Sequence, residues 1–368
     1  MRKWWNNKDK LTIRLTLSVS LGVNRGIFSK NSLRFFELLE SFCLIIGNFA
    51  PVFLRIEEMK TKIVIVGLGG VGGYYGGMLA RKYADDPGVE IYFIARGEHL
   101  KRVQQEGLTL ITADGTYVVK PTLATDHVSE IGTADYVILT TKSYDLDTTI
   151  EQIKPCIGRN TVILPLLNGV DISSRIRTLL PDTEVWNGCV YIVARLNEPG
   201  IVESSGGVHI LHFGVENHSS QRLLEFEKLL QDAGIDVKFH EDIAKVIWKK
   251  FFFISSTASL TSYFDVSFGA LLTDEFRKNT LCALLDELLL VANAEGAHVD
   301  NSEIHKIIHQ LEKLPFDSTS SMHSDFTARK NTELQTLTGI VIQLGKKHKI
   351  PTPIYEKVYL ELSNRMNH

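Results

Sequence analysis

The chain has 368 residues, of which 44% are hydrophobic and 23% charged, and its formal net charge is -3. This length is sufficient for two domains with sizeable cores. The near-neutral charge lacks the strongly basic balance typical of nucleic-acid-binding proteins, so no nucleic-acid partner is expected. The four cysteines are scattered without C-x-x-C spacing. We therefore expect reduced thiols in a cytosolic protein, with no disulfide framework.

The first 58 residues differ from the rest of the chain. They contain more Lys and Arg than Asp and Glu, and their apolar stretches, Phe42–Ile46 and Phe49–Leu54, are interrupted. Both are shorter than the ~18 apolar residues that a membrane-spanning helix needs, so no membrane association is expected. We expect Met59 to be the true start, with residues 1–58 poorly ordered or not translated. A membrane-surface or targeting segment is the alternative.

A glycine-rich turn follows the first apolar run, Lys62–Val66. Its sequence has the spacing G-x-G-x-x-G, and the next segment, Tyr74–Tyr83, is compatible with a helix. The first glycine permits a tight turn, the second lets a pyrophosphate approach the backbone, and the third permits close helix–strand packing. This order predicts dinucleotide binding, and an ordinary βα turn is the alternative. The residues of the turn are Gly67, Leu68, Gly69, Gly70, Val71 and Gly72.

The residue that follows the second predicted strand indicates which dinucleotide is bound. Arg96 follows Glu90–Ala95, where an NAD enzyme usually carries Asp or Glu to accept a hydrogen bond from the ribose 2′-hydroxyl. A guanidinium attracts a 2′-phosphate and offers no acceptor, so the sequence predicts NADPH as the cofactor. Glu98 could weaken this preference, and Arg96 could instead be a solvated loop cation.

Short apolar strands alternate with helical stretches from Lys62 to about His240, which predicts a Rossmann-like α/β domain with a mainly parallel sheet. Two alternating runs within Leu108–Val119 flank Asp114-Gly115 and predict a hairpin. Beyond Glu241 the pattern becomes helical. We expect an α/β domain at 59–240 and an all-α domain at 241–368, with a cleft between them. The predicted strands are Lys62–Val66, Glu90–Ala95, Tyr136–Thr140, Thr161–Leu166, Glu184–Val193, Val208–Phe213 and Val237–His240, and the clearest predicted helices are Phe276–Ala294 and Glu333–Leu344.

Five features from Met59 onward belong together: the glycine turn with Arg96, Thr141-Lys142, Leu167-Asn168-Gly169, Trp248-Lys249-Lys250, and Ser320-Ser321-Met322 followed by Thr332-Glu333. With these features the sequence resembles the ketopantoate reductase (2-dehydropantoate 2-reductase) family. The resemblance implies an NADPH-binding Rossmann domain followed by a helical domain of the 6-phosphogluconate-dehydrogenase-like type. The implied activity is the NADPH-dependent reduction of ketopantoate to pantoate, in coenzyme A biosynthesis. A homodimer is left open, with the Phe251–Phe253 run as its face or as core.

The resemblance also implies roles for individual residues. Lys250 matches the family's catalytic lysine, and an ammonium can both stabilise and protonate a carbonyl oxygen that gains charge. Glu333 matches the glutamate that binds the hydroxyl and carbonyl end of the substrate, and Ser321 matches the serine that holds its carboxylate. Asn168 is implied to touch the nicotinamide ribose and the substrate. Lys142 is implied to help bind the cofactor.

Several of these residues also have a purely structural explanation. Lys250 and Lys142 could be solvated cations, and Asn168 could serve a left-handed turn. No metal site is predicted, because no carboxylate or cysteine accompanies the strand histidines at metal-ligand spacing. These histidines are His209, His212 and His240.

Residues spaced by four are expected to share helix faces. Asp325, Arg329 and Glu333 are predicted on one face, where surface ion pairs are the alternative to a binding role. A second such face carries Lys250 with Ile254 and Ala258.

The positions of Ile254 and Ala258 are those where the family has two asparagines that orient the substrate and the lysine. An apolar Ile254 beside the amine is expected to lower the pKa of Lys250 by desolvation. Three functions therefore stay open: reduction of ketopantoate, reduction of a different bulky 2-oxo acid, or a non-catalytic NADP-binding sensor.

Overall fold

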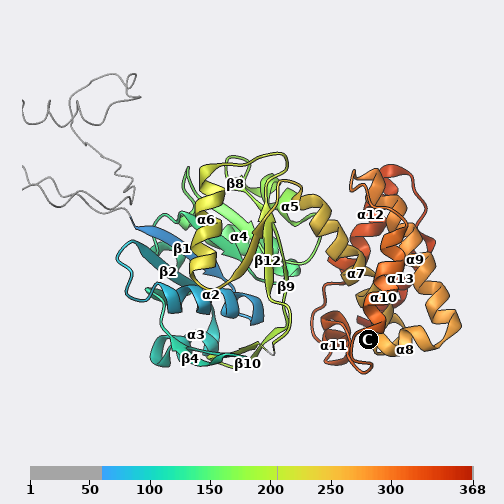
Figure 1. The fold of residues 1–368 in the computed structure, drawn as a ribbon, viewed down its shortest axis with the longest axis horizontal. Helices are drawn as coiled ribbons and strands as arrows, with labels where there is room; N and C mark the ends of the chain where they lie inside the picture. Colours follow the sequence, from blue (N-terminus) through green and yellow to red (C-terminus); the bar gives the residue numbers. More distant parts are fainter. Residues whose placement is uncertain (1–59, 205, 367–368) are drawn as a thin grey trace, which may run out of the picture. The chain divides into compact units, whose positions relative to one another are not determined.

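The computed structural model describes residues 60–204 and 206–366 (Figure 1). The predictions made for residues 1–58 lie outside this part of the chain. The described part begins with an α/β half, from β1 to β13, and ends with a helical half, from α7 to α13. The predicted fold class, a parallel-sheet α/β domain followed by a helical domain, is confirmed.

The α/β half is built on a six-stranded sheet in which every neighbouring pair is parallel. The strand order turns back at β1, because β2 lies on one side of β1 and β6 on the other. The turn after β1 thus lies at the switch point where α/β sheets bind ligands. In order across the sheet, the strands are β5 (Leu123–Thr125), β2 (Val89–Ile94), β1 (Thr61–Val66), β6 (Tyr136–Leu139), β7 (Val162–Pro165) and β8 (Glu184–Val185).

Both faces of this sheet are covered, which explains why its strands are continuously apolar. Ile63 and Ile65 of β1 enter one core, which also contains residues of α2 and α6. Val64 and Val66 enter a second core with residues of α4 and α5. The helices of this half are α2 (Gly70–Lys82), α3 (Gly97–Glu106), α4 (Leu146–Ile153), α5 (Ile172–Leu179) and α6 (Gln221–Asp232), with short 3₁₀ turns η1 (Val128–Glu130), η2 (Ser143–Asp145) and η3 (Lys154–Cys156).

The last predicted strands lie partly outside the parallel sheet. Glu184–Val193 divides at the fully buried Trp186 into β8, which pairs with β7, and β9 (Asn187–Tyr191), which pairs with β12. The indole packs in the core of the α/β half, and the backbone passes from one sheet to the other at this residue. A separate three-stranded sheet consists of β13 (Asp236–Phe239), β12 (Ile210–Gly214) and β9.

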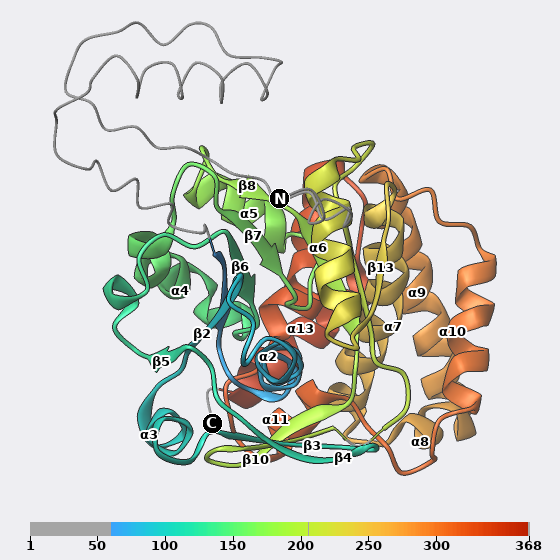
Figure 2. The ribbon, with the colours of Figure 1, turned by 60° about the vertical axis from the view of Figure 1, so that its left-hand side comes forward.

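The predicted hairpin around Asp114-Gly115 is confirmed as β3 (Leu108–Thr112) and β4 (Gly115–Val119). It belongs to a four-stranded sheet with β10 (Ala194–Glu198) and β11 (Ile201–Ser204) that packs on α2 (Figure 2). Glycines on α2 make this approach possible, because a Cβ on Gly70 would lie 2.1 Å from the carbonyl oxygen of Ala194, and one on Gly73 2.4 Å from Val202.

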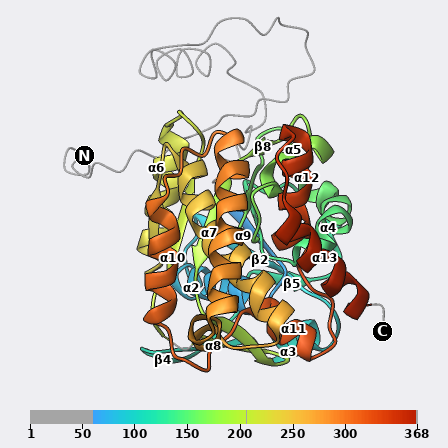
Figure 3. The same cartoon turned by 90° about the vertical axis from the view of Figure 1, so that its right-hand side faces the viewer.

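The helical half is organised around α7 (Ile243–Phe264), which packs with α9 and α10 side by side (Figure 3). Phe251 and Phe252 are fully buried in its core, which supports the core explanation of this aromatic run. The remaining helices are α8 (Phe268–Thr273), α9 (Glu275–Ala294), α10 (Ser302–Glu312), α11 (Ser321–Thr327), α12 (Ile340–His348) and α13 (Pro353–Met366), and a π-helical turn, η4 (Gln335–Gly339), precedes α12.

The predicted common helix face of Asp325, Arg329 and Glu333 is wrong. Helix α11 ends at Thr327, and Arg329 has a left-handed backbone with φ of 51°. The N–H of Lys330 donates to the carbonyl of Asp325, and that of Arg329 to the carbonyl of Phe326. These two bonds are a Schellman ending, which reverses the chain before Glu333.

Candidate functional site

The turn between β1 and α2 has the geometry of an anion-binding loop. Gly67 adopts a φ of +89°, and a Cβ on Gly72 would lie 1.9 Å from the carbonyl oxygen of Gly67. By contrast, a Cβ on Gly69 would meet nothing within 4 Å, so the space in front of this residue is open. Helix α2 has no acidic residue in its first turn and no side-chain cap. Its first N–H groups are therefore available to a phosphate.

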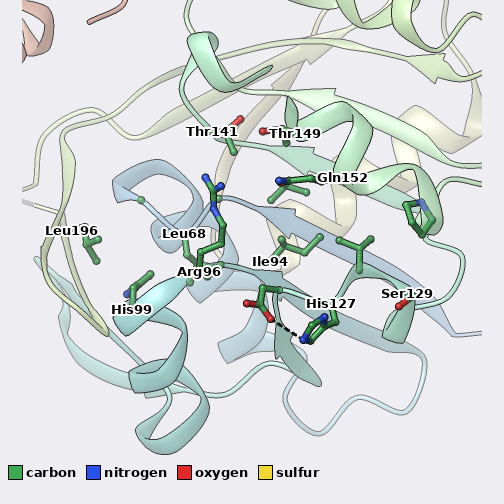
Figure 4. A pocket seen from close by; sticks show the side chains of 17 residues that line it. Leu68, Ile94, Arg96, His99, His127, Ser129, Thr141, Thr149, Gln152 and Leu196 are labelled. Atoms are coloured by element: carbon green, nitrogen blue, oxygen red, sulfur yellow. Dashed lines mark ion pairs between the residues drawn. The ribbon is translucent and has the colours of Figure 1, made fainter. Parts of the chain in front are cut away.

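A pocket of about 650 Å³ lies along this turn (Figure 4). Arg96 lines it from the end of β2 and points toward the side where Thr141 and Gln152 lie. Asp126 and His127, which follow the neighbouring strand β5, also line it, and their side chains approach to 3.6 Å. The sequence analysis missed both, because no local motif marks the end of so short a strand.

The pocket residues fit a dinucleotide. The hydroxyl oxygen Oγ1 of Thr141 is buried without a hydrogen-bond partner, at the edge of the pocket and beside Gly67. A phosphate or ribose oxygen would satisfy it. His99 lines the same pocket and accepts a hydrogen bond from the backbone N–H of Gly200 through Nδ1, and burial lowers its pKa. The imidazole is thus held in the pocket beside the glycine turn, with Nδ1 as an acceptor.

Lys250 and Asn168 meet where the two halves come together. Nζ of Lys250, on α7, donates to Oδ1 of Asn168 at 2.8 Å. The left-handed position in this loop belongs to Gly169, with φ of +129°, so a left-handed turn does not explain Asn168. Lys250 is only 7% exposed. Burial lowers its pKa, while Cys189 and Glu333 oppose that shift.

A second lysine approaches two carboxylates across the same junction. Nζ of Lys142, just before η2, lies 3.2 Å from Oδ2 of Asp325 and 3.4 Å from Oε2 of Glu333. Burial alone would lower the pKa of Lys142. The negative charges of Glu333 and Asp325 outweigh this effect, so the pKa of Lys142 is raised. Asp325 and Glu333 thus converge on one ammonium, although they do not share a helix.

Two hydroxyl groups complete this cluster, and the sequence analysis did not identify them. Oγ of Ser143 donates to Oε1 of Glu333 at 3.3 Å, and Oγ1 of Thr336 donates to Oγ of Ser143 at 2.7 Å. Their only sequence signal is that they lie close to Lys142 and Glu333 in the chain, which applies to many residues.

Ser321, Ile254 and Ala258 are the remaining residues to which the resemblance draws attention. Ser321 is the exposed first residue of α11. Its neighbour Ser320 caps the helix and bonds Thr261 of α7. Ile254 and Ala258 lie on α7, in the same continuous helix as Lys250, and Ala258 is buried.

Within residues 60–204 and 206–366, no group of three or more His, Cys, Asp or Glu side chains is arranged to hold a metal ion. Among the helices of these residues, none has the length and apolar character that crossing a bilayer requires. Of the predicted strand histidines, His212 and His240 bond each other at 2.9 Å, and His209 contacts Ser204.

Known proteins resemble the chain over both halves. The family model described as ketopantoate reductase PanE/ApbA matches residues 63–217, and the model of its C-terminal part matches residues 242–365. The uncharacterized oxidoreductase YkpB of Bacillus subtilis is 29% identical over 82% of this chain and 97% of its own length. A 2-dehydropantoate 2-reductase of Halobacterium salinarum is 28% identical, over 80% of this chain and 95% of its own. The crystal structure of 2-dehydropantoate 2-reductase from Porphyromonas gingivalis W83 has 37% identity and a TM-score of 0.73, over 83% of this chain and 100% of that one.

Proposed function

The chain belongs to the ketopantoate reductase family of oxidoreductases, and we propose that it reduces a 2-oxo acid, ketopantoate in the first place, with NADPH. Two relatives that carry the name 2-dehydropantoate 2-reductase support the choice of substrate. Arg96 at the end of β2 supports the choice of NADPH over NADH, because its guanidinium suits a 2′-phosphate. The division into domains at 59–240 and 241–368, and the cytosolic location, stay predictions.

The observation that carries this proposal is the hydrogen bond between Lys250 and Asn168. It holds a buried ammonium, whose pKa is lowered by burial, at the junction of the two halves. A bound NADPH supplies the hydride. Lys250 then donates a proton to the oxygen that was the carbonyl, which completes the hydroxyl group, and the neutral amine is reprotonated from solvent. A lowered pKa makes this ammonium a stronger acid than an exposed lysine.

The other residues bind and orient the reactants. Residues 67–72 and Thr141 would hold the pyrophosphate, and Asn168 would orient both Lys250 and the nicotinamide ribose. Glu333 would accept a hydrogen bond from the substrate, and Ser321 would reach its carboxylate once the substrate is bound. Lys142, which is implied to help bind the cofactor, also neutralises Glu333 and Asp325.

A second candidate substrate is favoured by the face of α7 that carries Lys250. Ile254 and Ala258 offer no hydrogen bond to a substrate hydroxyl. A substrate with an apolar side chain needs no such bond, so its affinity does not suffer at these positions. A branched or aromatic 2-oxo acid is therefore the alternative to ketopantoate.

Steady-state assays test these proposals. NADPH oxidation is measured with ketopantoate and with branched and aromatic 2-oxo acids, at matched concentrations. The highest kcat/KM with ketopantoate supports the first proposal, and the highest value with an apolar oxo acid supports the second. Tight NADPH binding without turnover of any of them would reject both and support a sensor.

A further inference from the structure

Ser143 forms part of a short hydrogen-bonded relay that joins the two halves beside Glu333. Thr336 donates to Ser143, and Ser143 donates to Oε1 of Glu333. Ser143 comes from η2 of the α/β half, whereas Glu333 and Thr336 belong to the helical half. A serine hydroxyl has one hydrogen to donate and lone pairs to accept. The direction is therefore fixed, with the carboxylate as the final acceptor.

The hydrogen bond of Thr336 differs from those of several other buried hydroxyl groups in the helical half. Buried Ser and Thr hydroxyls on α7, such as those of Ser256, Thr257 and Thr261, donate to carbonyl groups three or four residues earlier in their own helix. Thr336 lies instead in the π-helical turn η4 and donates to the other half of the protein. Such turns occur often at functional sites.

The relay leaves part of the carboxylate available for a ligand. Oε1 of Glu333 accepts from Ser143 and Oε2 from Lys142, which uses two of its roughly four lone-pair positions. Glu333 is 4% exposed and Ser143 1%, so both are fixed inside the protein. Because the Glu333 side chain is already held in one conformation, substrate binding incurs no further entropy cost for ordering it.

We propose that Ser143, oriented by Thr336, is a positioning residue that sets the carboxylate of Glu333 for the substrate. This inference rests on the proposed function of Glu333 in binding a 2-oxo acid. It concerns substrate affinity and not the cofactor, because Ser143 and Thr336 do not line the pocket beside the glycine turn.

Ser143→Ala and Thr336→Val remove the two links of the relay. Because a hydrogen bond to a charged group is lost, we expect Ser143→Ala to raise the KM for the oxo acid by about tenfold to a hundredfold. Thr336→Val acts through Ser143 and should raise KM less. Thr336→Ser keeps the hydroxyl and should reverse most of the effect of the valine. The dissociation constant of NADPH and the melting temperature are measured for each variant.

Ser259→Ala is the matched control. Ser259 also forms a buried 2.8 Å bond to a threonine, Thr338 in the same π-helical turn, whereas the side-chain bonds of Glu333 are to Lys142 and Ser143. It should lower the melting temperature without raising KM. The inference is overturned if Ser143→Ala leaves KM within twofold of the wild type, or if Ser259→Ala raises KM equally. If the wild type reduces no 2-oxo acid, the proposed function itself is rejected. If the wild type is active but Ser143→Ala has no effect on KM, only the inference about the relay is rejected.

Discussion

Replacing Lys250 with methionine tests the proton donor most directly. Methionine is unbranched and apolar, so it can fill much of the space of the buried lysine stem. The ammonium and its 2.8 Å bond to Asn168 are lost. Asn168 is half-buried, and water can replace the lost donor. Because burial of the ammonium already opposes its charge, we expect the variant to fold and to bind NADPH as the wild type does.

The expected loss of activity follows from the role of a general acid. Such a group typically contributes about 10²- to 10⁴-fold to the rate, which corresponds to about 2.7 to 5.4 kcal/mol of transition-state stabilisation. We expect kcat to fall within this range. The assay is NADPH oxidation at saturating oxo acid, together with an independent titration of NADPH binding.

Lys249→Met provides the control, because Lys249 is the adjacent residue of α7 and is exposed. It should leave kcat unchanged. A kcat of Lys250→Met within threefold of the wild type would refute the assignment. So would a loss of activity that comes entirely from weaker NADPH binding.

Four further results are expected. Arg96→Ala should weaken NADPH by at least tenfold more than NADH in binding titrations, because only NADPH has a 2′-phosphate, and equal losses would contradict this. Gly72→Ala should lower the free energy of unfolding by about 1–3 kcal/mol or more in denaturant titrations, since its Cβ would lie 1.9 Å from a backbone oxygen. Gly69→Ala should keep that stability, since its Cβ would meet nothing within 4 Å, yet weaken NADPH binding. The pKa of Lys250 is lowered in the folded state, so the unfolded chain binds more protons between that pKa and the ordinary 10.5. The free energy of unfolding should therefore rise with pH in this window in the wild type and less in Lys250→Met, and a parallel pH dependence would contradict this.

The α/β half could be predicted because its signals are local. The glycine spacing follows an apolar strand directly, and the period of the strands and helices is visible within about ten residues. The division of Glu184–Val193 could not be predicted, because the apolar pattern continues through Trp186 while the backbone changes sheet. Nor could the end of α11 at Thr327, since Arg329 has no glycine-like signal for its left-handed backbone.

The sequence analysis proposes site residues one by one, but it does not predict the contacts between them. Lys142 and Glu333 are separated by 191 positions, and Ser143 and Thr336 by 193. No sequence period links positions so far apart, and only the fold brings them together. This matters most for Lys142, which follows β6, the fourth strand across the parallel sheet, and whose ammonium meets two carboxylates of the helical half. An ammonium has three hydrogens, two of which are donated to Asp325 and Glu333, and its side chain is 41% exposed. The third stays available, and in the proposed function it would donate to the cofactor or the substrate. In that proposed reaction, loss of this ammonium would leave Asp325 and Glu333 uncompensated beside an anionic oxo acid.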